Sequence, residues 1–367
     1  MTKICFLFDH FNYQGGVCRS VIAVANLLSK NKDVEVTLIP IYEYVKKTEE
    51  LLSPEVKVKP VFGFFLRGMS RLVKKIPSRF LYKHIFREFY DVEVAFEKGT
   101  SLYILANSPK TSPSQKRIVW LHGYDEGLKQ GNCYLKMDKV VSVSEYNANR
   151  LKKELPGVNV DYCYNPIDEK EVCLKGEEPI EITRTTVPVL ISVGRLSPEK
   201  GFIRLMNCLL TLKNKGINFQ FWLIGDGPLK KEIYDEVNRL NLQDRVVLLG
   251  SQENPHKYTA KADVFVCSSF SEGYSTACTE AIMLGVPVIT TPVSGAEEII
   301  KDAGCGMVTG MDDDSLCNAL EKIINDKPLI NQWKNKVSQT RVNFSLKKRV
   351  SKLYDVLGIP EEKIENC

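Results

Sequence analysis

Short runs of β-branched and other apolar residues alternate with helical patterns along this chain. Such alternation predicts βαβ units, in which parallel strands form a sheet that helices cover on both faces. In the first half, the predicted strands are Ile4–Phe8, Val34–Ile39, Val56–Val61, Val92–Phe96, Arg117–Leu121 and Lys139–Val143. In the second half, they are Val189–Val193, Phe219–Ile224, Arg245–Leu249, Val264–Cys267 and Val286–Thr290. The pattern therefore predicts an α/β protein with two Rossmann-like domains.

A stretch rich in Glu and Thr, Glu169 to Thr186, interrupts the alternation, and we interpret it as a linker. The predicted domains are residues 1–176 and 187–345. A terminal helix is predicted over Leu346–Leu357, and we expect residues 346–367 to pack back toward the first domain. The length of 367 residues agrees with two domains.

Composition excludes several classes of protein. With 44% hydrophobic and 26% charged residues, the chain is neither mainly disordered nor collagen-like. The net charge of +5 is too small to indicate extensive nucleic-acid binding, and we expect no nucleic-acid partner. Met1 to His10 lacks a signal cleavage site and no apolar run reaches about eighteen residues, so we expect a cytoplasmic protein, at most peripheral on the inner face of the cell membrane.

The cysteines and histidines do not indicate a metal site. None of the eleven cysteines forms a Cys-x-x-Cys pair, and the four histidines lack metal-ligand spacing. We therefore expect neither a bound metal nor a cofactor.

Candidate binding residues are those that follow strands, because ligands of doubly wound sheets bind beyond the carboxyl ends of the strands. Gly15 and Gly16 open a helix after the first strand, where they would let a phosphate or sugar oxygen approach the backbone. An ordinary strand-to-helix turn explains this pair equally well. His122 follows Arg117–Leu121, where it could donate to a hydroxyl or phosphate or make a structural hydrogen bond.

The segment Gly194–Gly201 (GRLSPEKG) also leaves a strand, and we expect Ser197 to cap a helix that begins at Pro198. Arg195 can bind phosphate oxygens bidentately, and Lys200 adds a second cation. The alternative is two solvated surface charges. We favour phosphate binding because both residues lie at the end of a strand.

The most specific segment, Ser268 to Ile289, holds Glu272 and Glu280 with seven residues between them. Glu280 is the single carboxylate on a mostly apolar helix, and an ionised carboxylate suits the two adjacent hydroxyls of a ribose. Alternatively, it faces solvent. Glu272 could accept from sugar hydroxyls, while backbone N–H groups around Tyr274 to Thr276 would point toward phosphate.

Together, these segments resemble the retaining glycosyltransferases of GT-B fold, specifically the family 4-like bacterial cell-surface polysaccharide type with an E-x7-E motif. The resemblance rests on QGG, LHG, SVSE, NPID, GRLSPEKG, IGDGP, SEGYSTACTEA and GVPVI, which occur in the family's order. It implies two Rossmann-like domains facing each other across a cleft, with the nucleotide-sugar donor bound mainly by the second and the acceptor mainly by the first.

The resemblance also implies roles for individual residues. Arg195 and Lys200 would neutralise the donor diphosphate, Glu280 would hold the ribose, and Glu272 would contact the donor sugar. His122 would contact a donor hydroxyl near the reacting carbon, and the glycine pair would close over the phosphates. The implied catalytic residues are His122, Glu272, Arg195 and Lys200, and the implied substrate-binding residues are Gly15, Gly16, Arg195, Lys200, Gly273, Tyr274, Ser275, Thr276 and Glu280. No metal is implied, because cations and helix N-termini stabilise the leaving diphosphate.

The activity implied is retaining transfer of a hexose or N-acetylhexosamine from a nucleotide-diphosphate sugar to a glycan or lipid-linked acceptor, with UDP as the expected nucleotide. In this family, the departing phosphate helps to deprotonate an acceptor that attacks from the front face. Ser275 to Cys278 are smaller and more polar than the residues usual at these positions of the family, so the resemblance does not identify the donor sugar. Two alternatives are a nucleotide-sugar epimerase on the same frame and a non-catalytic sugar-nucleotide-binding subunit.

Residues Arg67–Tyr90, hereafter the basic segment, carry seven cations against one carboxylate, a net charge of +6, interleaved with apolar residues. This pattern favours an interfacial helix on an anionic membrane surface, and a solvated helix face is the alternative.

Overall fold

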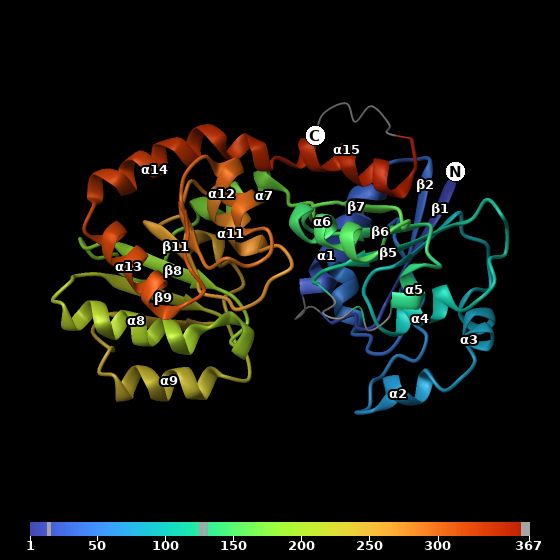
Figure 1. Cartoon of the computed structure of the whole chain (residues 1–367), viewed down its shortest axis with the longest axis horizontal. Helices are drawn as coiled ribbons and strands as arrows, with labels where there is room; N and C mark the ends of the chain where they lie inside the picture. Colours follow the sequence, from blue (N-terminus) through green and yellow to red (C-terminus); the bar gives the residue numbers. More distant parts are fainter. Residues whose placement is uncertain (13–15, 125–127, 129–130, 361–367) are drawn as a thin grey trace. The chain divides into compact units, whose positions relative to one another are not determined.

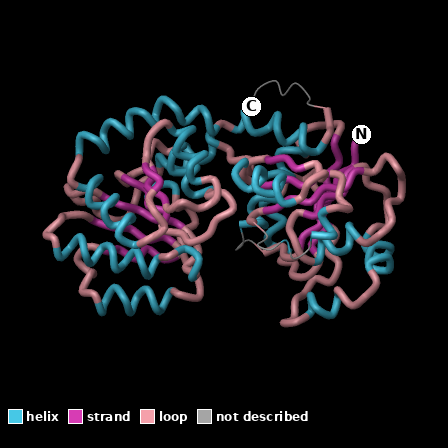
Figure 2. The backbone as a smooth tube through the Cα atoms, in the orientation of Figure 1, coloured by secondary structure: helices cyan, strands magenta, loops and turns pink. Residues whose placement is uncertain are grey.

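The structure, a computed structural model, describes residues 1–12, 16–124, 128 and 131–360. The chain forms two compact units, each built around its own parallel sheet with helices on its faces (Figure 1; Figure 2). The first unit combines Met1–Pro166 with the chain from Arg349 onward, and the second is Ile167–Lys348.

The first unit contains a seven-stranded parallel sheet in the order β3-β2-β1-β4-β5-β6-β7. Its strands are β1 (Thr2–Phe8), β2 (Val34–Pro40), β3 (Lys57–Val58), β4 (Val92–Ala95), β5 (Lys116–Leu121), β6 (Lys139–Ser142) and β7 (Val160–Tyr162). Its helices are α1 (Gly16–Leu28), α2 (Met69–Val73), α3 (Ser78–Ile85), α4 (Thr100–Ala106), α5 (Gly131–Tyr134), α6 (Glu145–Glu154) and α15 (Leu346–Leu357), with a 3-10 helix η1 at Lys46–Leu51. Chain order runs outward in both directions from the neighbours β1 and β4, which places the topological switch point between them.

Helix α15 is joined to the first unit by polar contacts. Lys352 Nζ lies 2.8 Å from Asp161 Oδ2, and Arg349 Nη1 donates to the carbonyl of Asn165 at 2.6 Å. Lys116 Nζ donates to the carbonyl of Gly358 at 3.0 Å. The first unit is therefore discontinuous in sequence.

The second unit contains a six-stranded parallel sheet in the order β10-β9-β8-β11-β12-β13. Its strands are β8 (Val189–Val193), β9 (Gln220–Ile224), β10 (Val246–Gly250), β11 (Val264–Cys267), β12 (Val288–Thr290) and β13 (Met307–Val308). Its helices are α7 (Glu169–Glu177), α8 (Phe202–Asn214), α9 (Lys230–Arg239), α10 (His256–Thr259), α11 (Thr276–Met283), α12 (Ala296–Ala303), α13 (Asp313–Ile324) and α14 (Lys327–Thr340), with 3-10 helices η3 at Pro198–Lys200 and η4 at Arg341–Phe344. Helices α8, α9 and α13 pack in one hydrophobic core on one face of the sheet, and α11 and α12 lie on the other, with α7 packed against α11 (Figure 1).

The expected linker is wrong in part, because Glu169–Glu177 is helix α7. Asp168 caps this helix by accepting from the N–H groups of Lys170 and Glu171. The helix packs against α10 and α11, so the second unit begins at Ile167 rather than after residue 176.

The basic segment does not form the single helix expected from its pattern. It contains two short helices, α2 and α3, and Pro77 is the N-cap of α3. Among the described residues, no helix has the length and apolar character needed to cross a membrane.

Candidate functional site

An ion pair links the carboxyl ends of two neighbouring strands in the second unit. Lys200 follows β8, and its Nζ lies 2.7 Å from Oε1 of Glu272, which follows β11. The hydroxyl of Ser269 donates to the same Oε1 at 2.6 Å. Both members are mostly buried, with side chains 25% and 12% exposed. The structure therefore brings together two residues that sequence reasoning had placed only separately.

The electrostatics of Lys200 follow from this contact. Burial alone would lower the pKa of Lys200, but the charge of Glu272 and its hydrogen bond outweigh burial and raise it. Lys200 is therefore a cation at neutral pH. Its ammonium group has three N–H donors and gives one to Glu272, so two remain for a ligand.

Gly201 permits this arrangement. Its φ of +66° is a conformation that L side chains rarely adopt, and a Cβ atom there would lie 2.2 Å from the carbonyl oxygen of Ser268. The hydroxyl of Ser268 in turn donates to the carbonyl of Lys200 at 2.9 Å. The two loops that carry Lys200 and Glu272 thus touch through backbone, which fixes the position of the ion pair.

The local structure before Lys200 corrects a sequence prediction. A helix was expected from Pro198 with Ser197 as its side-chain cap, but residues 198–200 form a single 3-10 turn and α8 begins at Phe202. The hydroxyl of Ser197 is instead bonded to Glu199 Oε1 at 2.5 Å. The left-handed Gly201 ends the turn, which is why the α-helix cannot start earlier.

Arg195 lies in the same loop, and its side chain is exposed. Among the described residues, its guanidinium has no hydrogen-bond partner. A long exposed cation of this kind is free to reach a ligand phosphate.

The start of α11 supplies backbone donors beside Glu272. Ser275 is the N-cap and accepts from the N–H of Cys278 at 3.3 Å, while Thr276 begins the helix. Gly273 precedes the buried Tyr274, whose ring packs so closely on Gly295 that a Cβ there would lie 2.6 Å from it. The first N–H groups of a helix have no acceptor within it, so they are available to an anion.

Glu280 lies on the second turn of α11 and is partly buried rather than fully solvated. Its Oε2 lies 3.4 Å from Nε2 of His256, at the start of α10. Sequence reasoning missed His256, although it follows β10 and so passed the same strand-end criterion as the other residues.

The predicted residues of the first unit are placed as follows. Gly15 lies outside the described residues. Gly16 begins α1 and is exposed, and a Cβ added there would meet no described atom within 4 Å, so packing does not require a glycine. His122 follows β5, and its ring lies 4.6 Å from that of Phe96. Burial lowers the pKa of His122 to about 4, so the ring is neutral at physiological pH.

A carboxyl pair at the switch point of the first unit was also missed. Leu7 of β1 is in register with Ala95 of β4, so Asp9 and Glu97 follow the two strands at matching positions. The N–H of Asp9 donates to Glu97 Oε1 at 2.5 Å. Burial and the charge of Glu97 raise the pKa of Asp9 to about 8, and burial raises that of Glu97 to about 7. The sequence feature that could have identified this pair is that each of the two residues follows the end of a strand.

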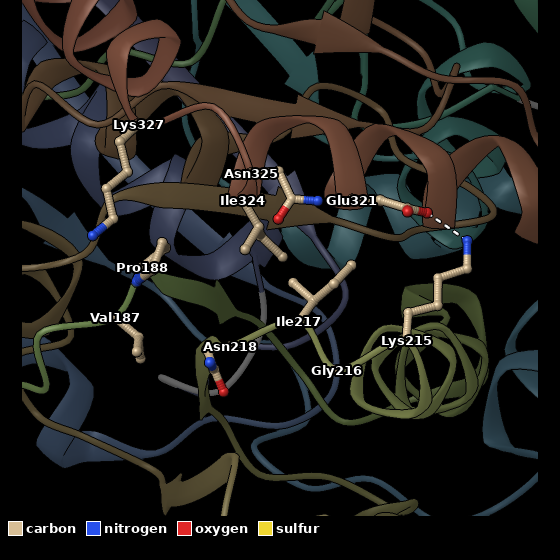
Figure 3. Close-up of a pocket in the computed structure, with 10 residues that line it drawn as sticks. All are labelled: Val187, Pro188, Lys215, Gly216, Ile217, Asn218, Glu321, Ile324, Asn325 and Lys327. Atoms are coloured by element: carbon tan, nitrogen blue, oxygen red, sulfur yellow. Dashed lines mark hydrogen bonds and ion pairs between the residues drawn. The ribbon is translucent and has the colours of Figure 1, made fainter.

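A hollow of about 560 Å³ lies at the opposite edge of the second sheet, where the strands begin (Figure 3). Val187 and Pro188 line it just before β8, and Lys215 and Glu321 form an ion pair at its side. None of the predicted site residues contributes to it. Among the described residues, no group of three or more His, Cys, Asp or Glu side chains is arranged to hold a metal ion.

Residues 177–340 match the protein family described as Glycosyl transferases group 1. Two proteins of Campylobacter jejuni are similar in sequence. One, an N-acetylgalactosamine-N,N'-diacetylbacillosaminyl-diphospho-undecaprenol 4-alpha-N-acetylgalactosaminyltransferase, is 29% identical over 60% of this chain and 59% of its own. The other, a GalNAc-alpha-(1->4)-GalNAc-alpha-(1->3)-diNAcBac-PP-undecaprenol alpha-1,4-N-acetyl-D-galactosaminyltransferase, is 26% identical over 94% of this chain and 95% of its own. The chain thus spans about three fifths of the first relative and nearly all of the second.

Solved structures share the fold. HepE of Anabaena, in complex with UDP, has a TM-score of 0.72 at 20% identity, covering 97% of this chain and 100% of that one. Sucrose-phosphate synthase of Thermosynechococcus elongatus has a TM-score of 0.73 at 16% identity, covering 98% and 99%. The two-sheet architecture is therefore the one these proteins have.

Proposed function

Because the chain belongs to the glycosyltransferases of GT-B fold, with a group 1 domain over residues 177–340, we propose that it is a retaining, metal-independent transferase of a hexose or N-acetylhexosamine. The proposed donor is a UDP-sugar. The proposed acceptor is a glycan on a lipid diphosphate carrier in cell-surface polysaccharide synthesis, since the Campylobacter relatives are named for undecaprenol-linked acceptors.

The observation that carries this proposal is the grouping of cations and helix N–H donors beyond β8 and β11. Arg195 and Lys200 supply two positive charges, and the start of α11 at Thr276 supplies backbone donors. Such groups stabilise the charge that develops on a leaving diphosphate without a metal. Glu272 fixes Lys200, and its second oxygen, Oε2, is left to accept from a hydroxyl of the donor sugar.

Glu280 is proposed to accept from the ribose hydroxyls of the nucleotide. An ionised carboxylate is an acceptor only, which suits two adjacent hydroxyl donors. Its partial burial on an otherwise apolar helix supports a role that needs a fixed carboxylate, because burial of a charge without partners is costly.

His122 is proposed to contact a hydroxyl of the donor sugar. Its ring is neutral, one nitrogen is engaged with the backbone of Phe96, and Nε2 has no partner among the described residues. With the other nitrogen donating to a carbonyl, Nε2 carries a lone pair and accepts from the sugar hydroxyl. Gly15 and Gly16 are proposed to admit the donor phosphates near the start of α1.

Two substitutions test the donor site, Lys200→Ala and Glu280→Ala. We expect Lys200→Ala to reduce sugar transfer about a hundredfold or more, as is found when one donor to a developing anion is removed. Glu280→Ala should also reduce transfer strongly, because it removes the acceptor proposed for the ribose hydroxyls and so weakens donor binding. Thermal melting with UDP, GDP and ADP identifies the nucleotide, since a ligand that binds the native state raises the melting temperature. Near-normal turnover in both variants, with melting temperatures unchanged, would reject the site.

We further propose that the enzyme acts at the inner face of the cell membrane and contacts anionic lipid through the basic segment. The structure adds that large apolar side chains are exposed in and just before this segment: Phe64, Phe65, Leu66, Leu72, Ile76, Phe80 and Phe89. Exposed aromatic and aliphatic groups among cations favour an anionic bilayer, where each basic residue contributes about 1 kcal/mol.

Vesicle co-sedimentation tests this contact. The charge reversals Lys74→Glu and Lys75→Glu together should lower partitioning onto vesicles with phosphatidylglycerol by more than tenfold. The matched control reverses Lys46 and Lys47, another exposed lysine pair of the first unit, and should leave partitioning nearly unchanged. Binding that is insensitive to anionic lipid content would exclude the proposal.

A further inference from the structure

An imidazole beside Glu280 has no role in the donor site as described so far. His256 follows β10, and its Nε2 lies 3.4 Å from Oε2 of Glu280 on α11. The two side chains are 16% and 28% exposed, so water only partly screens the contact. Glu280 has no other side-chain partner among the described residues.

The backbone around His256 is held by its neighbours. Asn254 Oδ1 accepts from the N–H groups of His256 at 3.1 Å and of Lys257 at 3.4 Å. Asn254 Nδ2 donates to the carbonyl of Lys175 in α7 at 2.9 Å. The turn that aims the imidazole is therefore anchored on a third helix, and its direction does not depend on Glu280.

This geometry restricts the carboxylate of Glu280. A glutamate side chain has three rotatable bonds, and it loses affinity for a ligand when it must be ordered during binding. The 3.4 Å contact with Nε2 of His256 holds Oε2 in place before a ligand arrives. It leaves Oε1 and the remaining lone pairs of Oε2 for hydroxyl donors.

We propose that His256 is a positioning residue of the donor site, which holds the Glu280 carboxylate in the orientation that accepts from the ribose hydroxyls of a nucleoside diphosphate. The inference rests on the proposed function, because it takes Glu280 as the ribose ligand. It assigns the chain a preference for ribose over 2′-deoxyribose that depends on a residue outside direct contact with the sugar.

Calorimetric binding of UDP and 2′-deoxy-UDP tests the inference. A site built to bond a hydroxyl discriminates against the analogue that lacks it. We expect His256→Ala to weaken the binding of UDP about tenfold, which corresponds to ~1.4 kcal/mol of binding free energy, and to weaken the binding of 2′-deoxy-UDP much less. In turnover, the KM for the donor should rise while kcat and the acceptor KM stay near their original values. A merely structural role would weaken both nucleotides equally.

Two further variants test whether the ribose preference depends on Nε2 or on Nδ1 of His256. His256→Gln carries an amide N–H near the position of Nε2 and should restore ribose preference, whereas His256→Asn carries it near Nδ1 and should not. The matched control is His10→Ala, which removes a similar pair in the first unit, where His10 Nδ1 lies 3.5 Å from Glu43 Oε2. It should leave the affinities for both nucleotides unchanged.

A double-variant cycle completes the test. If His256 acts through Glu280, His256→Ala causes no further loss of UDP affinity when Glu280 is already alanine. Additive losses, or an unchanged ratio of UDP to 2′-deoxy-UDP affinity in His256→Ala, would overturn the inference alone. If Glu280→Ala itself leaves UDP affinity unchanged, the proposed ribose site fails and this inference fails with it.

Discussion

The buried ion pair between β4 and β5 offers a test of what holds the first unit together. Arg117 and Glu93 are register partners in the two strands, and Arg117 Nε lies 2.8 Å from Glu93 Oε2. Their side chains are only 3% and 1% exposed. The guanidinium also donates to the carbonyls of Leu105, Ser108 and Pro109, which ties the loop between α4 and β5 to the sheet.

The substitution Arg117→Met keeps most of the side-chain volume but removes the charge and all these donors. Burial raises the pKa of Glu93 even with Arg117 present, so without the guanidinium this carboxyl must take up a proton or remain an unpaired buried charge. Breaking a buried pair in this way costs about 3 to 5 kcal/mol. For a unit of this size, that is a fall in melting temperature of roughly 6 to 20 °C.

The first unit contains a single tryptophan, the fully buried Trp120 of β5. Urea unfolding followed by fluorescence, in a background of Trp222→Phe and Trp333→Phe, therefore reports the first unit separately. The double substitution Glu93→Leu/Arg117→Met should recover a large part of the loss, because it leaves no unpaired charge. A cost below about 1 kcal/mol for Arg117→Met would refute the reasoning.

Two other substitutions give distinct readouts. Because the pKa of Asp9 is raised, the folded chain keeps a proton on this carboxyl that the unfolded chain releases, so the stability contributed by Asp9 is present at low pH and is lost as pH rises toward about 8. The substitution Asp9→Asn should therefore raise the melting temperature above that of the original chain, by an amount that grows between pH 6 and pH 9. A difference in melting temperature that does not change with pH would contradict the burial of the pair with Glu97. Gly201→Ala should lower both the melting temperature and UDP affinity, because its Cβ would meet the carbonyl of Ser268. Gly216→Ala, with a similar φ of +73° but nothing within 4 Å, should affect stability only, by about 1 kcal/mol.

Periodicity predicted most of the strands because a parallel sheet covered on both faces needs continuous apolar runs. The short edge strands β7 and β13 were missed, since three and two residues carry too little pattern. The sequence of helix α7, EKEVCLKGE, is polar and weakly periodic, so its local pattern predicts a linker. Its cap and its packing against α10 and α11 lie outside that local pattern.

The candidate site was predictable as positions but not as pairs. The strand-end criterion pointed to Lys200 and to the loop that holds Glu272, and Glu280 stood out as the single carboxylate on a mostly apolar helix. The contacts Lys200–Glu272 and His256–Glu280 join residues from different loops and helices, and their distances depend on how β8, β10 and β11 are ordered in the sheet. One sequence without relatives carries no signal for such pairings.

The discontinuity of the first unit has a consequence for how the chain is made. Its last helix, α15, which includes the buried Leu353 and Tyr354, is synthesised only after residues 167–345, which are nearly the whole of the second unit. At roughly 5 to 20 residues per second, the ribosome takes about 10 to 40 s over that interval. Throughout it, the surface near Asp161 and Asn165 that α15 covers is open, while the continuous second unit can fold as it emerges. In a circular permutant that places residues 349–360 ahead of Met1, these residues would be synthesised before the rest of the first unit. The first unit could then fold completely before synthesis of the second begins.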